Sequence, residues 1–321
     1  MFVGRTEQAV GFLNGMFGDL LAERGSGLAL PMTFRYGGAD LRLDRAALAD
    51  QLADATGAAC VFVPGLMSSD AVWRFAGRPE ITYGSRLAAD RNVTPVFVSY
   101  NSGRHISENG NQLALMLEAL VSTWPGELDE LSLVGHSMGG LVIRSASHYG
   151  TVHGHAWVKK LRRVVLLGAP LSGAPLEKIL HLADFTLTTI WNPVTRLVGR
   201  VLRHRSAGIK DLRFGALLDE DWSGHDPDAL RWPSRTPVPL IATAEHYVIA
   251  GTLTDRSDHP AAQVLGDPLV TCFSARGQTL PTWGATLVAE TNMRTLPGVG
   301  HLALAHHEDV YQQMLSWWTA P

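Results

Sequence analysis

The chain has 321 residues, of which 46% are hydrophobic and 18% are charged. This composition excludes general disorder, and the length fits one large α/β domain with an insertion, or two small domains. The formal net charge of −3 gives no basic excess, so we expect no nucleic-acid partner and no binding to an anionic membrane surface through charge.

The first predicted element is a helix over residues 9–22, with one buried face. Asn14 and Asp19 interrupt its apolar residues, and no basic region or cleavage site frames it, so a signal peptide is not predicted. No uncharged apolar run is long enough to span a bilayer. We therefore expect a cytoplasmic protein without a transmembrane segment.

A β-hairpin and then a helix are predicted next. Residues 32–38 and 39–44 alternate between apolar and polar side chains around a Gly-Gly turn, which is typical of a hairpin. Residues 45–56 have the pattern of a helix.

Short runs of β-branched and aliphatic residues follow, at 60–65, 94–101, 131–135 and 162–170. Such runs fit strands that are buried on both faces of a parallel sheet. Helices are predicted between them at 107–124 and 138–149. This alternation predicts a mostly parallel, doubly wound α/β sheet with right-handed crossovers.

The alternation breaks at residues 171–236, which we interpret as a helical cap or lid inserted into a core formed by 1–170 and 237–321. In the second part of the core, two further strands and a final helix are predicted, at about 239–253, 286–297 and 308–318.

The pentapeptide Gly135-His136-Ser137-Met138-Gly139 lies between a predicted buried strand and a predicted helix. A nucleophilic serine in a G-x-S-x-G motif needs this context, because a sharp strained turn must lift its hydroxyl above the sheet. Small residues at 135 and 139 would let the strand and the helix approach closely. The motif predicts Ser137 as a nucleophile.

A serine nucleophile needs a base, and the base needs an orienting acid, in the chain order Ser, acid, His. His301 is the predicted base, because it follows the last predicted strand and precedes the final helix. Asp267, in the run LGDPLV, is the predicted acid, and Asp255 and Asp258 are its rivals.

An oxyanion hole needs two backbone N–H groups. One is expected from Met138, directly after the nucleophile. The other is expected from Leu66 in the loop after the 60–64 strand, with Met67 as the alternative donor.

Substrate contacts are expected from Met67, His136 and Trp191. Trp191 belongs to an apolar helical face within 184–202 that would line an acyl pocket or touch a lipid interface, or else pack on the core of its own chain. Arg104 or His105, after another strand end, would contact a polar leaving group, or else belong to a solvated loop.

No metal and no cofactor are predicted. The histidines at 148, 153 and 155 cluster in sequence, but no His/Cys/Asp set has convincing ligand spacing. Cys60 and Cys272 each lie in an apolar run, so two buried free thiols are expected, with one disulfide between them as the alternative.

Four motifs in order resemble those of bacterial α/β-hydrolase lipases and esterases, nearest to relatives of the GPI-inositol deacylase type. They are GHSMGGLV (135–142), LLGAPLSGAPLEK (166–178), GDPLV (266–270) and PGVGHL (297–302). The resemblance covers roughly 60–175 and 240–318, and it implies the α/β-hydrolase fold, with Gly65-Leu66 as the oxyanion element, Asp267 as the acid and His301 as the base. The chain departs from the family at Pro64, where a histidine usually supports the oxyanion loop.

Together these features predict a serine hydrolase that cleaves a small-molecule or lipid carboxylic ester through an acyl-enzyme, with transient contact to a lipid interface. The same triad also serves thioesterases and acyltransferases, and a binding protein without activity could retain the fold.

Overall fold

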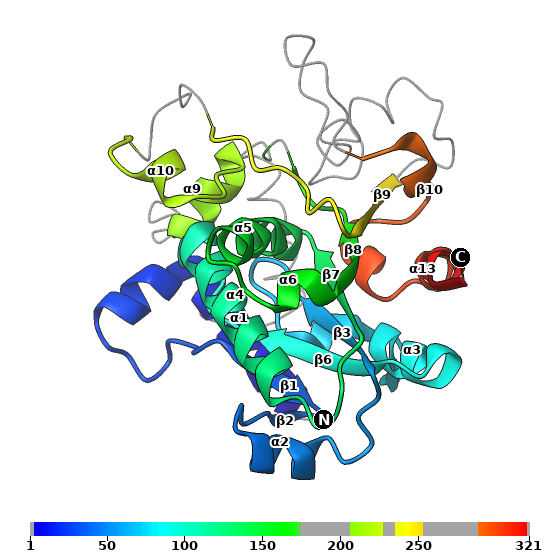
Figure 1. Ribbon diagram of the computed structural model, residues 1–321. Helices are drawn as coiled ribbons and strands as arrows, with labels where there is room; N and C mark the ends of the chain where they lie inside the picture. Colours follow the sequence, from blue (N-terminus) through cyan, green and yellow to red (C-terminus); the bar gives the residue numbers. More distant parts are fainter. Residues whose placement is uncertain (1–2, 172, 174–205, 227–234, 253–287, 320–321) are drawn as a thin grey trace.

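The computed structural model describes residues 3–171, 173, 206–226, 235–252 and 288–319 (Figure 1). Its centre is an eight-stranded sheet in the order β10-β9-β8-β7-β3-β6-β1-β2. The strands are β1 (Thr33–Tyr36), β2 (Ala39–Asp40), β3 (Ala58–Val63), β6 (Thr94–Ser99), β7 (Glu130–His136), β8 (Leu161–Leu167), β9 (Glu245–Thr252) and β10 (Met293–Pro297). Every pairing from β10 to β6 is parallel. The predicted mostly parallel α/β sheet is therefore confirmed.

The predicted hairpin forms the antiparallel end of this sheet. β1 and β2 pair around Gly37 and Gly38, whose φ angles of 57° and 85° suit residues without a Cβ. β1 also pairs antiparallel with β6, which joins the hairpin to the parallel strands.

Two hydrophobic cores lie on the two faces of the sheet, because successive side chains of a strand point to opposite faces. In β3, Val61 and Val63 belong to one core, and Cys60 and Phe62 belong to the other. The first core includes residues of α1 (Val3–Glu23), α2 (Arg45–Gln51), α4 (Ile106–Thr123), α5 (Met138–Val152) and α6 (Trp157–Lys160). The second includes residues of α3 (Tyr83–Arg91) and α13 (Glu308–Thr319).

Several elements differ from the sequence-based expectations. The segment between β3 and β6 contains the 3₁₀ turn η1 (Asp70–Trp73), the small hairpin β4 (Arg74–Phe75) and β5 (Arg78–Thr82), and α3, none of which was predicted. β9 begins at Glu245 rather than near 239, and α2 ends at Gln51 rather than at 56. Two more 3₁₀ turns, η2 (Glu290–Asn292) and η3 (Leu302–Ala305), lie on either side of β10.

In the region interpreted as a cap, the structure describes two short helices, α9 (Ala207–Phe214) and α10 (Asp219–Trp222). α9 contacts α1 and α4, and both short helices lie beside the start of α4 (Figure 1). The boundaries of the cap stay a prediction. Within the described ranges, no helix is long and apolar enough to cross a membrane.

Candidate active site

The carboxyl ends of the central strands lie at one edge of the sheet. The register pairs Val63 with Gly135, His136 with Leu167, and Leu167 with Ile249, so β3, β7, β8 and β9 end close together. In open parallel sheets, ligands bind beyond this edge. The predicted nucleophile follows β7, the predicted oxyanion loop follows β3, and the predicted base follows β10.

Ser137 forms the sharp turn between β7 and α5. Its φ and ψ angles are 54° and −126°, outside the regions that a residue with a side chain normally occupies. Its N–H donates to the carbonyl oxygen of Leu167 at 2.8 Å, and its own carbonyl accepts from the N–H of Gly140 at 3.0 Å. A strained backbone of this kind costs about 1–3 kcal/mol and clusters at functional sites.

Three glycines around the turn at Ser137 allow the neighbouring segments to pack closely. A Cβ on Gly135 would lie 2.7 Å from the Cα of Gly140, and a Cβ on Gly139 would collide with the carbonyl oxygen of Val63. A Cβ on Gly65 would lie 2.9 Å from the Cβ of Ser137. β7, α5 and the loop after β3 therefore approach one another so closely that only glycine fits at these three positions.

His301 lies on the loop after β10, at the start of η3, and is 3% exposed. Its ring packs against Gly168, because a Cβ there would lie 3.1 Å from Nδ1 of His301. Gly168 follows Leu167, whose carbonyl binds the amide of Ser137. The end of β8 therefore contacts both the turn of the predicted nucleophile and the ring of the predicted base.

His136 adds a second connection between these two segments. Its Nε2 forms a hydrogen bond with the carbonyl oxygen of His301 at 2.9 Å, and the two ring centroids are 5.0 Å apart. The edge of Trp73 packs against the ring of His136, with centroids 6.3 Å apart. This buried histidine fixes the backbone of the loop that carries His301.

Two backbone amides of the loop after β3 differ in their hydrogen bonds. Leu66 is 2% exposed, and within the described residues neither its amide nor that of Met138 takes part in a hydrogen bond. Met138 is the first residue of α5, and the first amides of a helix have no acceptor within the helix, so both amides can donate to a bound atom. The N–H of Met67, in contrast, donates to Oγ of Ser102 at 3.1 Å. Leu66 is therefore the better donor, and Met67 the poorer one.

Comparisons with known proteins bear on the fold of the chain. Residues 54–210 match the family model of the PGAP1-like alpha/beta domain. The mature form of the lipase BlEst2 from Bacillus licheniformis superposes with a TM-score of 0.51 at 17% identity, over 82% of this chain and 92% of that one. The chain has the α/β-hydrolase fold. An α/β-hydrolase fold protein from Chitinophaga pinensis gives a TM-score of 0.47 at 10% identity, over 83% of this chain and 91% of that one. No curated protein matches the sequence significantly.

The family match covers the predicted oxyanion loop and the turn at Ser137, but it ends before His301. The predicted acid Asp267, its rivals Asp255 and Asp258, and the predicted substrate contact Trp191 lie outside the described residues. Cys272 lies outside them too. The assignments of Ser137, Asp267 and His301 to a triad therefore stay predictions.

The two other predicted substrate contacts lie at the site but are buried. Met67 is 4% exposed and His136 is 1% exposed. Their burial favours a role in holding the loop after β3 and the His301 loop in place, and direct contact with substrate stays a prediction.

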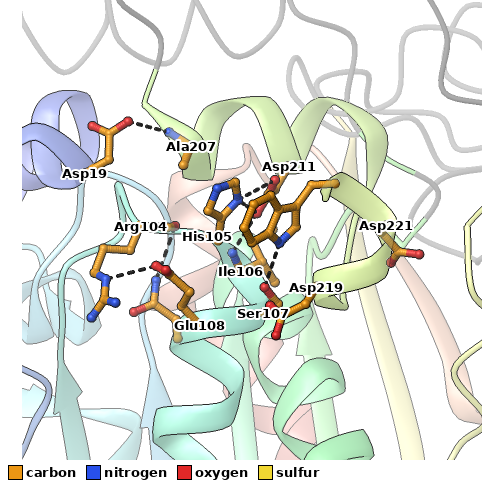
Figure 2. A network of polar contacts seen from close by, with 12 residues as sticks. Asp19, Arg104, His105, Ile106, Ser107, Glu108, Ala207, Asp211, Asp219 and Asp221 are labelled. Carbon is orange, nitrogen blue, oxygen red and sulfur yellow. Dashed lines mark hydrogen bonds and ion pairs between the residues drawn. The ribbon is translucent and has the colours of Figure 1, made fainter. Parts of the chain in front are cut away.

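Arg104 and His105 bind other side chains of the protein (Figure 2). Nε of Arg104 donates to Glu108 at 3.0 Å, and Nδ1 of His105 lies 3.0 Å from a carboxylate oxygen of Asp211. The His105 ring also stacks on Trp222, with centroids 3.6 Å apart. These side chains line a surface cavity of about 700 Å³ between α1, α4, α9 and α10, and nothing in these contacts favours a leaving-group role.

Charge and burial oppose each other in the His105–Asp211 pair. Burial disfavours the imidazolium, but the hydrogen bond and the charge of Asp211 outweigh it and raise the pKa of His105. Burial also raises the pKa of Asp211, against the lowering effect of His105. The pair fastens α9 to the start of α4.

The sequence analysis gave no role to two residues near the site, Tyr100 and Ser102. The hydroxyl of Tyr100 donates to the carbonyl oxygen of Pro64 at 2.8 Å, and Ser102 binds Met67 as described. The only sequence signal was their place at the end of β6, which lies next to β3 in the sheet.

Other predicted features lie away from these loops. Tyr149 and the histidines at 148, 153 and 155 form a row of ring contacts at the end of α5. Within the described part of the chain, no three His, Cys, Asp or Glu residues could together hold a metal ion. Cys60 is a buried free thiol in β3, and its burial raises its pKa.

Proposed function

We propose that this α/β-hydrolase is a serine hydrolase that cleaves carboxylic esters. The observation that carries the proposal is the strained turn at Ser137, with φ of 54° and ψ of −126°, which the end of β8 places beside the loop of His301. The buried amides of Leu66 and Met138 support it, because they offer the two N–H donors that an oxyanion needs.

In the proposed reaction, Oγ of Ser137 attacks the ester carbonyl while His301 accepts the hydroxyl proton. The amides of Leu66 and Met138 donate to the negative oxygen of the tetrahedral intermediate. His301 then gives its proton to the departing alcohol, which leaves an acyl group on Ser137. A water molecule, deprotonated by His301, releases the acid and restores the enzyme.

Two parts of the proposal rest on residues that the structure does not describe. Asp267 is proposed to accept a hydrogen bond from His301 and so to set its tautomer. Trp191 is proposed to contact the acyl chain, which would make the substrate a hydrophobic small-molecule ester or a lipid ester.

The deciding experiment compares Ser137→Ala with the unaltered protein on short and medium p-nitrophenyl esters. We expect kcat/KM to fall by at least about 10³-fold, because the nucleophile is removed while the fold remains. Ser122→Ala is a matched control, since Ser122 is an exposed serine on α4. Undiminished turnover in Ser137→Ala would overturn the assignment.

Labelling and product analysis separate the alternatives. A fluorophosphonate probe should label the unaltered protein at Ser137, whereas no labelling would favour a binding protein. Ester product formed in water with added alcohol would favour acyl transfer, and preferred cleavage of a matched thioester would favour a thioesterase.

A further inference from the structure

We propose that Tyr100 and Ser102 are positioning residues that hold the oxyanion loop from both sides, a role that rests on the proposed function. The loop concerned is Pro64–Met67, which contains the proposed donor Leu66. Both residues come from the segment directly after β6, which pairs with β3 in the sheet.

The first contact lies before Leu66 in the loop. Tyr100 is 2% exposed, and its hydroxyl donates to the carbonyl oxygen of Pro64 at 2.8 Å. This carbonyl belongs to the peptide unit that joins Pro64 to Gly65. The bond therefore fixes the orientation of the peptide directly before Gly65-Leu66.

The second contact lies after Leu66. Ser102 is 1% exposed, and its Oγ accepts from the N–H of Met67 at 3.1 Å. Met67 has a φ of 59°, in the left-handed region that costs energy for a residue with a side chain. The Ser102 bond helps to hold this conformation and removes the Met67 amide from the site, while the Leu66 amide stays available.

Ser102 itself lies on a turn that is fastened to three helices. Asn101 donates to the carbonyl of Gly18 in α1 at 2.8 Å, and the side chain of Asn109 in α4 donates to the carbonyl of Asn101 at 3.0 Å. The amide of Gly208 in α9 donates to the carbonyl of Gly103 at 3.0 Å. A turn held at three points can hold the oxyanion loop in a single geometry.

The side of the loop away from the nucleophile is covered by α1. A Cβ on Gly15 would collide with the side chain of Met67, and a Cβ on Gly11 would lie 3.0 Å from the carbonyl oxygen of Ser68. The loop therefore has little room to shift once both hydroxyl contacts are made.

The test measures Tyr100→Phe and Ser102→Ala, each of which removes one hydroxyl from the loop support. Because oxyanion donors act on the transition state, we expect kcat to fall by about 10- to 100-fold with KM within about threefold of the unaltered value. Ser102→Thr keeps a hydroxyl and should retain most of the activity. Tyr247→Phe and Ser147→Ala are matched controls, because each removes the hydroxyl of a buried residue that binds away from the loop.

A trifluoromethyl ketone inhibitor separates positioning from general damage, since its hemiketal adduct places an oxyanion in the hole. Its inhibition constant should rise in Tyr100→Phe and Ser102→Ala in parallel with the loss in kcat/KM. Unchanged kcat in both variants, or reduced kcat with unchanged inhibitor affinity, would overturn the proposal. If Ser102→Ala does not fold, Tyr100→Phe decides by the same criteria. Failure of the proposed function would show separately, as turnover by the unaltered protein that survives Ser137→Ala.

Discussion

At the scale of single residues, Gly65 shows how closely the proposed oxyanion loop approaches the proposed nucleophile Ser137. A methyl group there would lie 2.9 Å from the Cβ of Ser137 and 3.2 Å from the carbonyl oxygen of His136. Neither of these atoms can move away easily, because the first belongs to the strained turn and the second to β7.

We therefore expect Gly65→Ala to lower kcat/KM by about 100-fold, because a displacement of about 1 Å at a reacting centre has an effect of this size. Gly27→Ala is the matched control, since a Cβ on Gly27 would meet no atom within 4 Å. Steady-state kinetics and thermal unfolding of both variants check the prediction. Activity of Gly65→Ala within threefold of the unaltered protein would show that the loop relaxes freely.

The sequence could point to candidate residues whose predicted role depends on their neighbours along the chain. Ser137 stands in a motif whose glycines are required by contacts between adjacent elements, and His301 follows the last strand. Tyr100 and Ser102 could not be found in this way, because their partners Pro64 and Met67 are 36 and 35 residues away. Arg104 and His105 have the right chemistry for a substrate contact, but Glu108 and Asp211 bind them.

At the scale of elements, the buried carboxylate of Asp211 joins α9 to the start of α4. Asp211 is 0% exposed and accepts from the amide of Ile106 at 2.8 Å as well as binding His105. The amide of Ala207, at the start of α9, donates to Asp19 of α1 at 3.0 Å (Figure 2). These contacts join three helices that lie far apart in sequence.

Asp211→Ala should destabilise the protein by about 3 kcal/mol, because it leaves the partially buried His105 and a buried amide without their acceptor. Urea unfolding at pH 7 measures the change. Asp50→Ala, at an exposed position of α2, should stay within about 0.5 kcal/mol of the unaltered protein. A loss below about 1 kcal/mol in Asp211→Ala would show that α9 is held mainly by its apolar contacts.

The central strands that the sequence predicted correctly have a continuous apolar pattern. β3, β6, β7 and β8 all read as buried runs, since helices cover both faces of the sheet. α3 was missed because only one face of it is buried and its start depends on a capping box between Thr82 and Ser85. The predicted strand at 239–253 was too long, because the carbonyls of Val238 and Pro239 bind the Arg144 side chain and β9 pairs only from Glu245.

At the scale of the whole molecule, two ionisable side chains, Arg144 and His246, are buried between the packed elements. Arg144 of α5 is 3% exposed, and burial lowers its pKa to about 10. His246 of β9 is 7% exposed and forms a hydrogen bond through Nε2 with the carbonyl of Ile241 at 3.1 Å. Burial, with a further contribution from the charge of Arg144, lowers the pKa of His246 to about 4.

This depressed pKa makes the stability of the protein sensitive to acid. In the unfolded chain His246 binds a proton below about pH 6.5, whereas in the folded protein it stays neutral down to about pH 4. Its contribution is therefore complete above pH 6.5 and is lost as the pH falls towards 4, by about 3 kcal/mol at most. Below pH 4 both states are protonated, and this group adds no further loss.

His246→Asn should remove that part of the pH dependence. Urea unfolding at pH 7.0, 5.5 and 4.5 should show the unaltered protein more stable than the variant at pH 7.0, because its buried ring packs in the core. The difference should shrink as the pH falls, since carboxylates elsewhere affect both proteins equally. His153→Gln, at an exposed position, should follow the unaltered protein in parallel. If the free energy of unfolding of His246→Asn changed with pH as it does in the unaltered protein, the burial of neutral His246 would not cause the acid sensitivity.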